Sequence, residues 1–380
     1  MLNNKHLMLV AGETSGDIHA ADLVRALKAQ DPSLTFSGMG GPCLLEEGVK
    51  IYADLTQMAV IGFVEVFRHL FAVKRLFDLF LKKAEEIRPA AVILVDYPGF
   101  NLRLARALKK RGIKVIYYIS PKVWAWKEGR VRTIKACVDR LLIIFDFEKD
   151  FYARHAFSAD FVGNPLIDHI KVTISRQDLL KSKGLDPDRP TIGLIPGSRV
   201  KEIKNMLPVM VRAAKLIKER IPQAQFLLSK AKALDPLLIN AHIRNQRIPI
   251  AVVENEFHNC VNACDVCIVT SGTATLETGL LEKPMVIVYK TAWLTSVLVR
   301  LFLKIKWVGL VNIIAQKEIA PELIQQDATP ENIAERLLAI YGDPFQMEAA
   351  INALKDVRRK LGGPGASHRA AQIVLEEIGA

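Results

Sequence analysis

The chain has 380 residues, half of them hydrophobic, and a formal net charge of +12. This length suits two domains with a large buried core. The positive charge favours an acidic partner, such as nucleic acid, an anionic membrane surface or a phosphorylated small molecule, or it serves solubility alone. Five cysteines and the lack of a signal-peptide pattern indicate a cytoplasmic protein without a disulfide framework. The lack of a long uncharged apolar run argues against a membrane span.

Short apolar strands are predicted to alternate with helices in two successive series. Continuous apolar runs of this length are typical of parallel strands that are buried on both faces. We therefore predict an α/β fold with two Rossmann-like domains, in which ligands bind at the carboxyl ends of the strands. The expected strands lie within residues 6–12, 90–99, 114–120 and 140–146 in the first series and within 191–198, 224–230, 250–254, 266–272 and 284–290 in the second.

The first expected strand runs into the stretch GETSGD, residues 12–17. This stretch lacks both the G-x-G-x-x-G pattern of dinucleotide-binding turns and the lysine of a P-loop. The Ser15 hydroxyl and the Gly16 N–H could face an anionic or hydroxyl-rich ligand at a helix N-terminus. Alternatively, the stretch is a tight turn in which Thr14, Ser15 or Asp17 caps the helix.

Asp96 directly follows the apolar run 92–95, and Pro98 and Gly99 bend the chain behind it. A carboxylate that is partly desolvated at the end of a buried strand suits a general base. The alternative is a cap for the next helix. The expected position at the ligand-binding edge of the sheet favours the catalytic role.

The next expected strand ends at Ser120, and Trp124, Trp126 and a basic cluster follow it. Aromatic faces beside cations suit a sugar phosphate or a nucleic acid. Alternatively, the tryptophans pack in the core. The cations of this cluster are Lys127, Arg130 and Arg132.

Two turns of the second series suit anions. In the first turn, Gly197 and Ser198 open a helix and Arg199 stands at its N-terminus, so that N–H groups and a guanidinium would meet a diphosphate. The second turn lies within 270–279, where small residues allow the backbone to approach a phosphate. One turn into its helix, the Glu277 carboxylate can accept hydrogen bonds from both hydroxyls of a ribose.

The cysteines at 260, 264 and 267 have the C-x-x-x-C-x-x-C spacing of radical iron–sulfur enzymes. However, Cys260 and Cys264 fall on a helix pattern and Cys267 falls within a strand, which leaves no open loop for a cluster. We interpret all three as buried side chains. The histidine and carboxylate spacings predict no metal site either.

Residues 62–83 and 293–307 combine large apolar side chains with lysines and arginines at helical spacing. A helix facing the core would explain one apolar stripe. Both stretches carry more large apolar residues than one buried stripe requires, and we therefore expect them to touch anionic lipid. The residues expected to do so are Phe67, Phe71, Lys74 and Arg75.

Short segments along the chain carry a resemblance to a known family. In order between residues 11 and 312 they are AGETSGD, GFVEV, DYPGFN, YYISPKVWAW, FVGNPL, PGSRVKEI, SGTATLE and VGLVN. Together they resemble the lipid-A-disaccharide synthases, which are glycosyltransferases of the GT-B architecture. The resemblance implies an acceptor-binding domain at 1–168, a UDP-sugar-binding domain at 169–345 that faces it across a cleft, and C-terminal helices at 346–380 that cross back.

The resemblance also implies the reaction. UDP-2,3-diacylglucosamine would be the donor and 2,3-diacylglucosamine 1-phosphate the acceptor, and an inverting transfer would give the β-1′,6-linked lipid A disaccharide 1-phosphate and UDP. The enzyme would act as a peripheral protein on the inner face of the inner membrane of a Gram-negative bacterium. We expect no cofactor, no metal and no nucleic-acid partner, and a homodimer is conceivable.

Carried over by position, the resemblance implies roles for individual residues. Asp96 would be the general base, and Arg199 would stabilise the leaving group. The donor would be bound by Gly197, Ser198, Arg199, Ser271, Gly272, Thr273, Glu277 and Asn312, and the acceptor by Glu13, Ser15, Gly16, Asn101 and Ser120. Three residues depart from the family pattern: Gly99 replaces the second aspartate of D-x-P-D, Asn164 replaces a histidine, and Val311 replaces the proline of L-P-N.

Two alternative functions stay open. The first is another GT-B enzyme that uses a UDP-amino sugar, such as a peptidoglycan transferase or an epimerase, although the apolar and basic stretches favour an acylated substrate. The second is a non-catalytic protein that binds a nucleotide sugar or a nucleic acid. Such a protein would not need Asp96 at the end of a strand.

Overall fold

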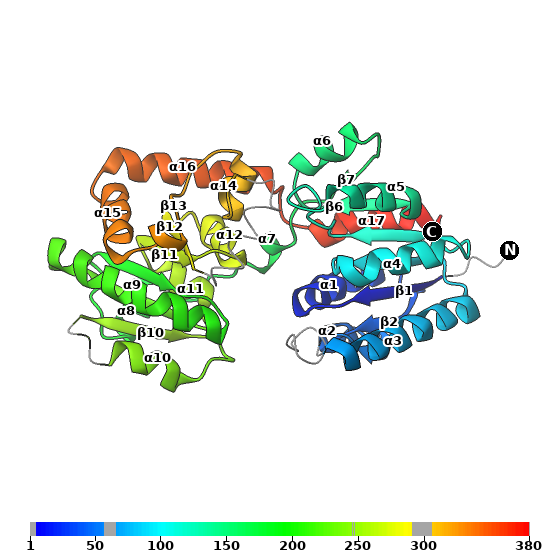
Figure 1. The fold of residues 1–380 in the computed structure, drawn as a ribbon, viewed down its shortest axis with the longest axis horizontal. Helices are drawn as coiled ribbons and strands as arrows, with labels where there is room; N and C mark the ends of the chain where they lie inside the picture. The colour runs from blue at the N-terminus through cyan, green and yellow to red at the C-terminus, as the bar shows by residue number, and fades with distance from the viewer. Residues whose placement is uncertain (1–4, 57–65, 245, 247, 291–305, 380) are drawn as a thin grey trace. The chain divides into compact units, whose positions relative to one another are not determined.

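The computed structural model describes residues 5–56, 66–244, 246, 248–290 and 306–379 (Figure 1). Internal contacts divide the chain into two compact units, Met1–Pro165 with Leu361–Ala380 and Leu166–Lys360. Each unit contains its own sheet, and every pairing between described strands is parallel. The predicted α/β fold class with two Rossmann-like domains is therefore confirmed.

The sheet of the first unit has the strand order β3-β2-β1-β4-β5-β6-β7. Its strands are β1 His6–Ala11, β2 Thr35–Gly40, β3 Lys50–Asp54, β4 Ala91–Val95, β5 Val115–Tyr118, β6 Arg140–Ile143 and β7 Asp160–Phe161. Its helices are α1 Thr14–Gln30, α2 Pro42–Glu46, α3 Val66–Ile87, α4 Pro98–Lys109, α5 Val131–Cys137, α6 Phe147–Arg154 and α17 Ala366–Ile378, with a 3-10 helix at Glu128–Arg130.

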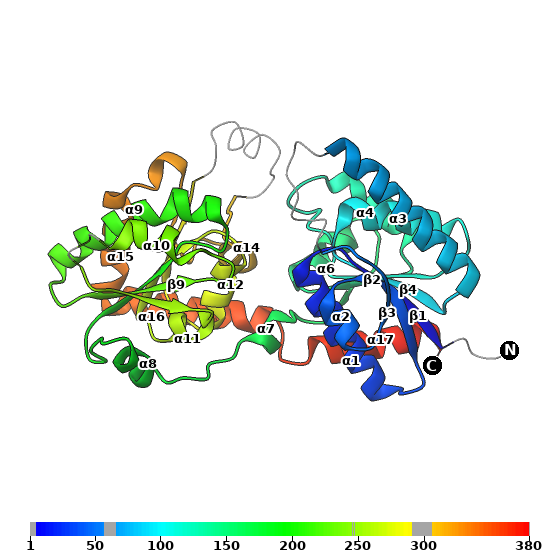
Figure 2. The same ribbon diagram turned by 90° about the horizontal axis from the view of Figure 1, so that it is seen from below.

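Helices cover both faces of this first sheet (Figure 2). Successive side chains of a strand point to opposite faces, so the neighbouring residues of β1 enter different cores. Leu7 and Leu9 pack with apolar residues of α1 and α17, whereas Met8 and Val10 join a core that includes α3, α4 and α5. The C-terminal helix α17 therefore completes one face of the sheet in which the chain began.

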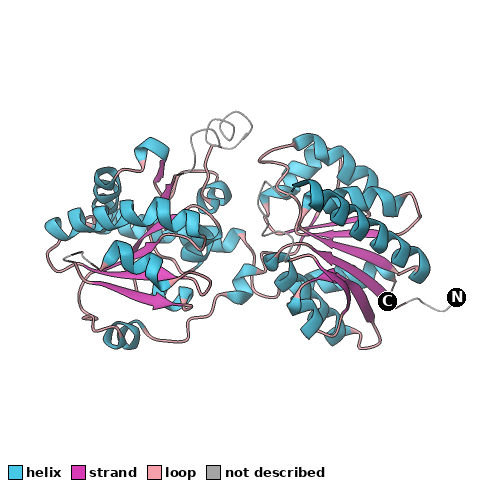
Figure 3. Cartoon of the chain, turned by 60° about the horizontal axis from the view of Figure 1, so that its bottom comes forward, coloured by secondary structure: helices cyan, strands magenta, loops and turns pink. Residues whose placement is uncertain are grey.

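The sheet of the second unit has the strand order β10-β9-β8-β11-β12-β13, with helices on both faces (Figure 3). Its strands are β8 Thr191–Ile195, β9 Gln225–Lys230, β10 Ile250–Glu254, β11 Val266–Thr270, β12 Met285–Tyr289 and β13 Glu322–Ile324. Its helices are α7 Leu166–His169, α8 Arg176–Ser182, α9 Val200–Arg220, α10 Pro236–Ile243, α11 Phe257–Asn262, α12 Thr273–Leu280, α14 Leu310–Ala315, α15 Pro330–Tyr341 and α16 Pro344–Lys360, with a 3-10 helix at Gln325–Asp327.

Helices α9 and α15 share a core with one face of the second sheet, and α16 packs against α12 and α14. The three clustered cysteines are buried here as predicted, since Cys260, Cys264 and Cys267 each have 0% exposure. The absent Cβ of Gly193 would lie 2.7 Å from the Cys267 sulfur, so the thiols fill the space beside β8. Cys264 and Cys267 also have pKa values well above the ordinary value, mainly through burial for the first and through the Cys264 hydrogen bond for the second.

The strand order places one topological switch point in each sheet. In the first sheet β1 and β4 are neighbours, and the chain continues from β1 to β2 on one side and from β4 to β5 on the other. In the second sheet β8 and β11 are the corresponding central pair. Ligands of open α/β sheets bind beside the carboxyl ends of such strand pairs. The predicted site segments follow these four strands. Residues 12–17 follow β1 and Asp96 follows β4, whereas residues 197–199 follow β8 and residues 271–273 follow β11.

A buried carboxyl joins the segment after β5 to the start of α6. Glu148, at 1% exposure, accepts hydrogen bonds from Trp124 Nε1 at 3.1 Å and from Phe145 N at 3.2 Å. The Trp124 ring packs edge-on against Phe147, so this tryptophan belongs to the core. Trp126 is 43% exposed, with Lys127 Nζ 4.2 Å from its ring centroid.

Burial raises the pKa of Glu148 from 4.5 to about 8, against the smaller opposing effect of its hydrogen bonds. The folded chain therefore holds a proton that the unfolded chain releases, and the free energy of unfolding falls as the pH rises from 4.5 towards 8. We expect the difference in melting temperature between Glu148→Gln and the wild type to shift in favour of the variant as the pH rises from about 5 to about 9. Thermal melts at several pH values check this. The control is Asp150→Asn, an exposed change on the same helix, and a melting difference that does not vary with pH would contradict the expectation.

Candidate functional site

The turn after β1 and the turn after β4 lie against each other at the first switch point. The Tyr97 ring covers Gly12, where a Cβ atom would come within 2.2 Å of the ring. Asp17 does not cap its own helix. Its two carboxylate oxygens accept hydrogen bonds from Gly41 N at 2.7 Å and Cys43 N at 2.9 Å, at the N-terminus of α2. The small residues and the aspartate of GETSGD therefore serve packing, while Glu13 and Ser15 remain exposed.

Asp96 occupies an unfavourable backbone conformation. Asp96 and Tyr97 have φ values of 45° and 47°, in the left-handed region that non-glycine residues rarely adopt. The Asp96 carbonyl accepts hydrogen bonds from Asn101 Nδ2 at 2.8 Å and from the Tyr117 hydroxyl at 2.5 Å, and the Asp96 N–H donates to Tyr118 O at 3.1 Å. These bonds hold a strained pair of residues, a feature that is concentrated at functional sites.

The Asp96 carboxyl is electrostatically suited to accept a proton. Burial, followed by the negative charge of Glu13, raises its pKa to about 6, and the positive charge of Lys122 opposes the shift. Such a carboxyl is ionised at neutral pH and is a stronger base than an ordinary aspartate. The alternative role as a helix cap is not supported, because Tyr97 is the N-cap of α4 and no side chain caps that helix.

Asn101 and Ser120, which we expected to bind the acceptor, are buried at 0% and 4% exposure. Asn101 Nδ2 also donates to Val95 O at 3.2 Å, so this side chain holds the backbone on both sides of the strand end. The Ser120 hydroxyl lies 2.5 Å from the Tyr152 hydroxyl. In the structure both residues support the segments that carry Asp96 and the β5 loop, and their contact with the acceptor stays a prediction.

A groove of about 630 Å³ lies beside Tyr97, between α3 and α4. The phenylalanines of α3 divide between core and surface: Phe80 is buried, Phe77 meets the Phe100 ring edge-on at 5.7 Å, and Phe71 is 79% exposed. An added Cβ at Gly99 would meet nothing within 4 Å, so the glycine leaves the groove open. The groove is lined by Phe71, Val73, Lys74, Phe77, Tyr97, Gly99, Phe100 and Arg103.

Some of the residues expected to contact lipid are not among those that the structure describes. The Phe67 side chain and residues 62–65 and 293–305 are not among the described residues. Lys74 and Arg75 are exposed on α3. Among the helices in the described part of the chain, none is both long enough and apolar enough to span a membrane.

In the second unit, a pocket of about 450 Å³ opens at the carboxyl ends of β8, β9, β10 and β11. It brings together the two turns that the sequence proposed for anions. Of the expected donor-binding residues, Gly197, Ser198, Arg199, Ser271, Gly272, Thr273 and Glu277 all line it. Burial raises the pKa of Glu277 above its ordinary value, and this side chain offers the pocket two acceptor oxygens.

Sequence reasoning missed Lys230, which lines the same pocket with Ser229 and Asn255. The Lys230 side chain is 4% exposed, and its Nζ lies 3.3 Å from Glu254. A buried cation beside a pocket attracts anions because little water screens it, and Glu254 already neutralises part of this charge. The available signal was its place as the last residue of an expected strand, at the edge of the sheet where ligands bind.

Asn312, expected to bind the donor, has 0% exposure and does not line this pocket. Its Nδ2 donates to Ala320 O at 2.7 Å and to Glu322 Oε1 at 2.8 Å, and its Oδ1 accepts from Ile319 N at 2.8 Å and Ala320 N at 3.0 Å. With its amide fully used, Asn312 positions the loop before β13. Val311 is also buried, against Gly279, and Asn164 is 3% exposed.

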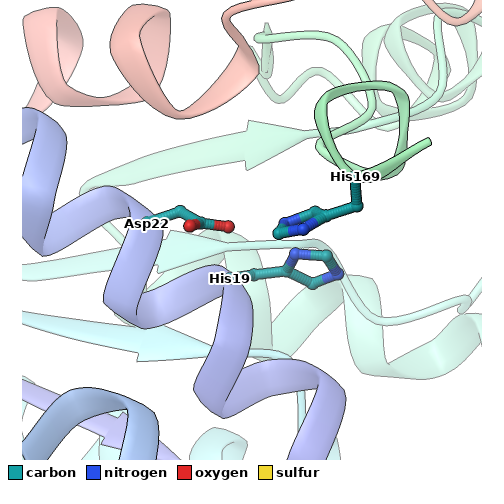
Figure 4. A group of neighbouring side chains, drawn as sticks. All are labelled: His19, Asp22 and His169. Carbon is teal, nitrogen blue, oxygen red and sulfur yellow. The ribbon is translucent and has the colours of Figure 1, made fainter. Parts of the chain in front are cut away.

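Figure 4 shows His19 and Asp22 on α1, one turn apart on the same face of the helix, together with His169 of α7. Asp22 already pairs with Arg25 Nη1 at 2.9 Å. Within the first unit these residues supply two potential ligands, fewer than the three protein ligands of a catalytic zinc site. We therefore assign no metal to them, and the absence of a metal stays a prediction.

Comparison with known proteins agrees with this geometry. The family model for lipid-A-disaccharide synthetase matches residues 7–376. A lipid-A-disaccharide synthase of Syntrophus aciditrophicus (strain SB) is 44% identical over 378 residues, which cover 99% of each chain. The solved structure of a putative UDP-N-acetylglucosamine 2-epimerase from Listeria monocytogenes matches with a TM-score of 0.65 at 15% identity, covering 98% of this chain and 95% of that one. A glycotransferase of kitacinnamycin gives 0.64 at 15% identity and covers 98% of both chains.

The solved structures share the fold alone at this level of identity, whereas the sequence matches extend over nearly the whole chain. The expected resemblance is confirmed, and so is the glycosyltransferase class. The chain belongs to the lipid-A-disaccharide synthase family.

Proposed function

We propose that the protein transfers diacylglucosamine from UDP-2,3-diacylglucosamine to the 6-hydroxyl of 2,3-diacylglucosamine 1-phosphate. The observation that carries this proposal is the Asp96 carboxyl, partly buried at a switch point and with a pKa of about 6, in a chain of this family. A transferase needs one base for the acceptor hydroxyl. A protein that only binds a nucleotide sugar does not.

The donor UDP is proposed to occupy the pocket of the second unit. Ser198 and Arg199 present N–H groups at the start of α9, and the Lys230 ammonium lies in the same pocket. These groups suit a diphosphate because helix N-termini and cations both stabilise negative charge. Glu277 would accept hydrogen bonds from the ribose hydroxyls, and the small residues Ser271 and Gly272 allow the ligand to approach the backbone.

The acceptor is proposed to lie beside Asp96, with an acyl chain in the groove between α3 and α4. Tyr97 lines this groove and directly follows Asp96 in the chain, so the groove begins one residue from the base. Phe71, Phe77 and Phe100 supply apolar walls, and Lys74 and Arg103 supply cations for the 1-phosphate. A ligand that combines an acyl chain with a phosphate matches this pairing of surfaces.

The proposed reaction is a single inverting displacement. Asp96 takes the proton of the acceptor 6-hydroxyl, and the oxygen forms a bond to the donor anomeric carbon. The bond from that carbon to the UDP oxygen breaks, and UDP leaves with the electron pair. Arg199 and the N-terminus of α9 stabilise the charge that develops on the departing diphosphate.

The release of UDP tests this function against its alternatives. Purified protein is incubated with UDP-2,3-diacylglucosamine in detergent, with or without 2,3-diacylglucosamine 1-phosphate. We expect UDP and the disaccharide 1-phosphate to appear together only when the acceptor is present. Equal UDP release without the acceptor would indicate a hydrolase or an epimerase, and no release would indicate a binding protein. Either result would contradict the proposal.

The role of Asp96 predicts a distinct pH profile. The base must be ionised, so kcat/KM should rise with pH up to about 6 and level off above it. Asp96→Asn should slow turnover by about 10²–10⁴-fold and leave UDP binding nearly unchanged in calorimetry. Glu13→Gln should move the acidic limb to lower pH, because it removes a negative charge that raises the pKa of Asp96. Near-wild-type turnover by Asp96→Asn would exclude this residue as the base.

We also propose that α3 contacts an anionic membrane surface. The proposed substrates of the protein carry acyl chains and would reside in a membrane. On α3, Phe71 is 79% exposed and lies beside the exposed Lys74 and Arg75. Anionic lipid attracts each nearby cation by about 1 kcal/mol, and salt screens this attraction. Lys83 is a poor candidate because its ammonium lies 2.7 Å from Glu86 of the same helix.

Reversal of three exposed charges on this helix is expected to weaken membrane binding. The test variant combines Lys74→Glu, Arg75→Glu and Lys82→Glu, and the control combines Lys181→Glu, Lys183→Glu and Lys232→Glu, which are exposed positions of the second unit. In sedimentation with anionic vesicles, wild type and control should bind in a salt-sensitive manner and the test variant should bind much less. Equal binding by all three proteins, or none by the wild type, would place α3 away from the membrane.

A further inference from the structure

The N-terminus of α9 already holds a carboxylate from its own chain. Glu202 Oε2 accepts hydrogen bonds from Ser198 N at 2.9 Å and from Arg199 N at 3.1 Å. Its other oxygen, Oε1, lies 3.0 Å from Arg199 Nη1. The Glu202 side chain is 20% exposed, whereas that of Arg199 is 82% exposed, so the guanidinium lies outermost in this cluster.

These contacts use the same groups that the donor diphosphate requires. A backbone N–H has one hydrogen to donate, and it can form a strong hydrogen bond to one anion at a time. Glu202 and a phosphate group therefore cannot both hold the N–H groups of Ser198 and Arg199. The two anions would also repel each other in a pocket that partly excludes water.

Gly197 brings the Glu202 carboxylate close to this turn. Gly197 has a φ of +105°, and a Cβ atom there would lie 2.3 Å from Glu202 Oε2. A side chain at this position would push the carboxylate off the two N–H groups. Gly197, Glu202 and Arg199 all line the 450 Å³ pocket, so the carboxylate lies within the proposed donor site.

We infer that Glu202 is a built-in competitor for the donor diphosphate. In the structure it accepts hydrogen bonds from the N–H groups of Ser198 and Arg199, just before α9, and holds the Arg199 guanidinium. When the donor binds, the Glu202 carboxylate leaves these groups to the phosphates. After transfer it takes them back, which favours the departure of UDP. This inference rests on the proposed function, because it assumes that UDP occupies this pocket.

The experiment compares the binding of UDP and of uridine by calorimetry. Glu202→Gln removes the charge but retains an oxygen that can cap the helix. We expect UDP to bind this variant at least about tenfold more tightly than the wild type, because the competing charge-assisted hydrogen bonds are lost. Uridine has no phosphate and should bind both proteins equally. In turnover, KM for the donor should fall and inhibition by UDP should become stronger.

Two further variants separate competition from simple repulsion. Glu202→Asp keeps the charge but shortens the side chain by about 1.5 Å, so its carboxylate no longer reaches both N–H groups. Competition predicts tighter UDP binding by Glu202→Asp, whereas repulsion alone predicts wild-type binding. Glu219→Gln, an exposed change in the last turn of the same helix, should have no effect.

The outcomes also distinguish this inference from the proposed function. If the wild type binds UDP but Glu202→Gln binds it equally or more weakly, while melting as the wild type does, Glu202 supports the site and the inference is overturned. The inference is also overturned, in favour of simple repulsion, if Glu202→Asp binds UDP as the wild type does. If the wild type binds no UDP, the donor site and the inference fail together.

Discussion

The pairing of β1 with β4 and of β8 with β11 determines where chemistry can occur in each unit. From these central strands the chain proceeds in opposite directions, so the turns at their carboxyl ends diverge and leave an edge for ligands. In the first sheet Ala11 pairs with Val95, which places Gly12 and Asp96 next to each other as the two strands end. In the second sheet Ile195 pairs with Val269, and the two anion-suited turns follow.

The two switch points carry different side chains although their topology is the same. The first presents carboxyl groups: Asp96 is partly buried near the negative charge of Glu13, and its pKa rises to about 6. The second lines its pocket with the cations Arg199 and Lys230 beside the carboxylates of Glu202 and Glu277. The base proposed in one unit and the donor pocket proposed in the other suit a reaction in which a hydroxyl is deprotonated and a diphosphate departs.

Several polar residues of the motifs build the backbone of the sites instead of lining them. Asn101 and Tyr117 hold the carbonyl of Asp96, whose left-handed conformation is unfavourable by itself. Asn312 and Glu322 act similarly in the second unit, where the Glu322 carboxylate also accepts hydrogen bonds from Val308 N at 2.8 Å and Gly309 N at 2.9 Å. Both ends of the Asn312 amide are used within the protein in this way, whereas Asn101 Oδ1 has no hydrogen-bond partner among the described residues.

The sequence alone determined the α/β class, the strands formed by continuous apolar runs, and the residue types at the ends of the central strands, because burial on both faces imposes an unmistakable pattern. It did not reveal β2, whose segment TFSGMG is not an apolar run; its Gly38 packs so closely on β1 that a Cβ would lie 2.0 Å from Leu9 O. The sequence also did not distinguish the partly exposed Asp96 from the buried Asn101 of the same motif. It did not reveal that Lys230 lines the pocket or that Glu202 contacts the turn before α9. Those distinctions depend on the direction of each side chain, and contacts between segments distant in the sequence decide that direction.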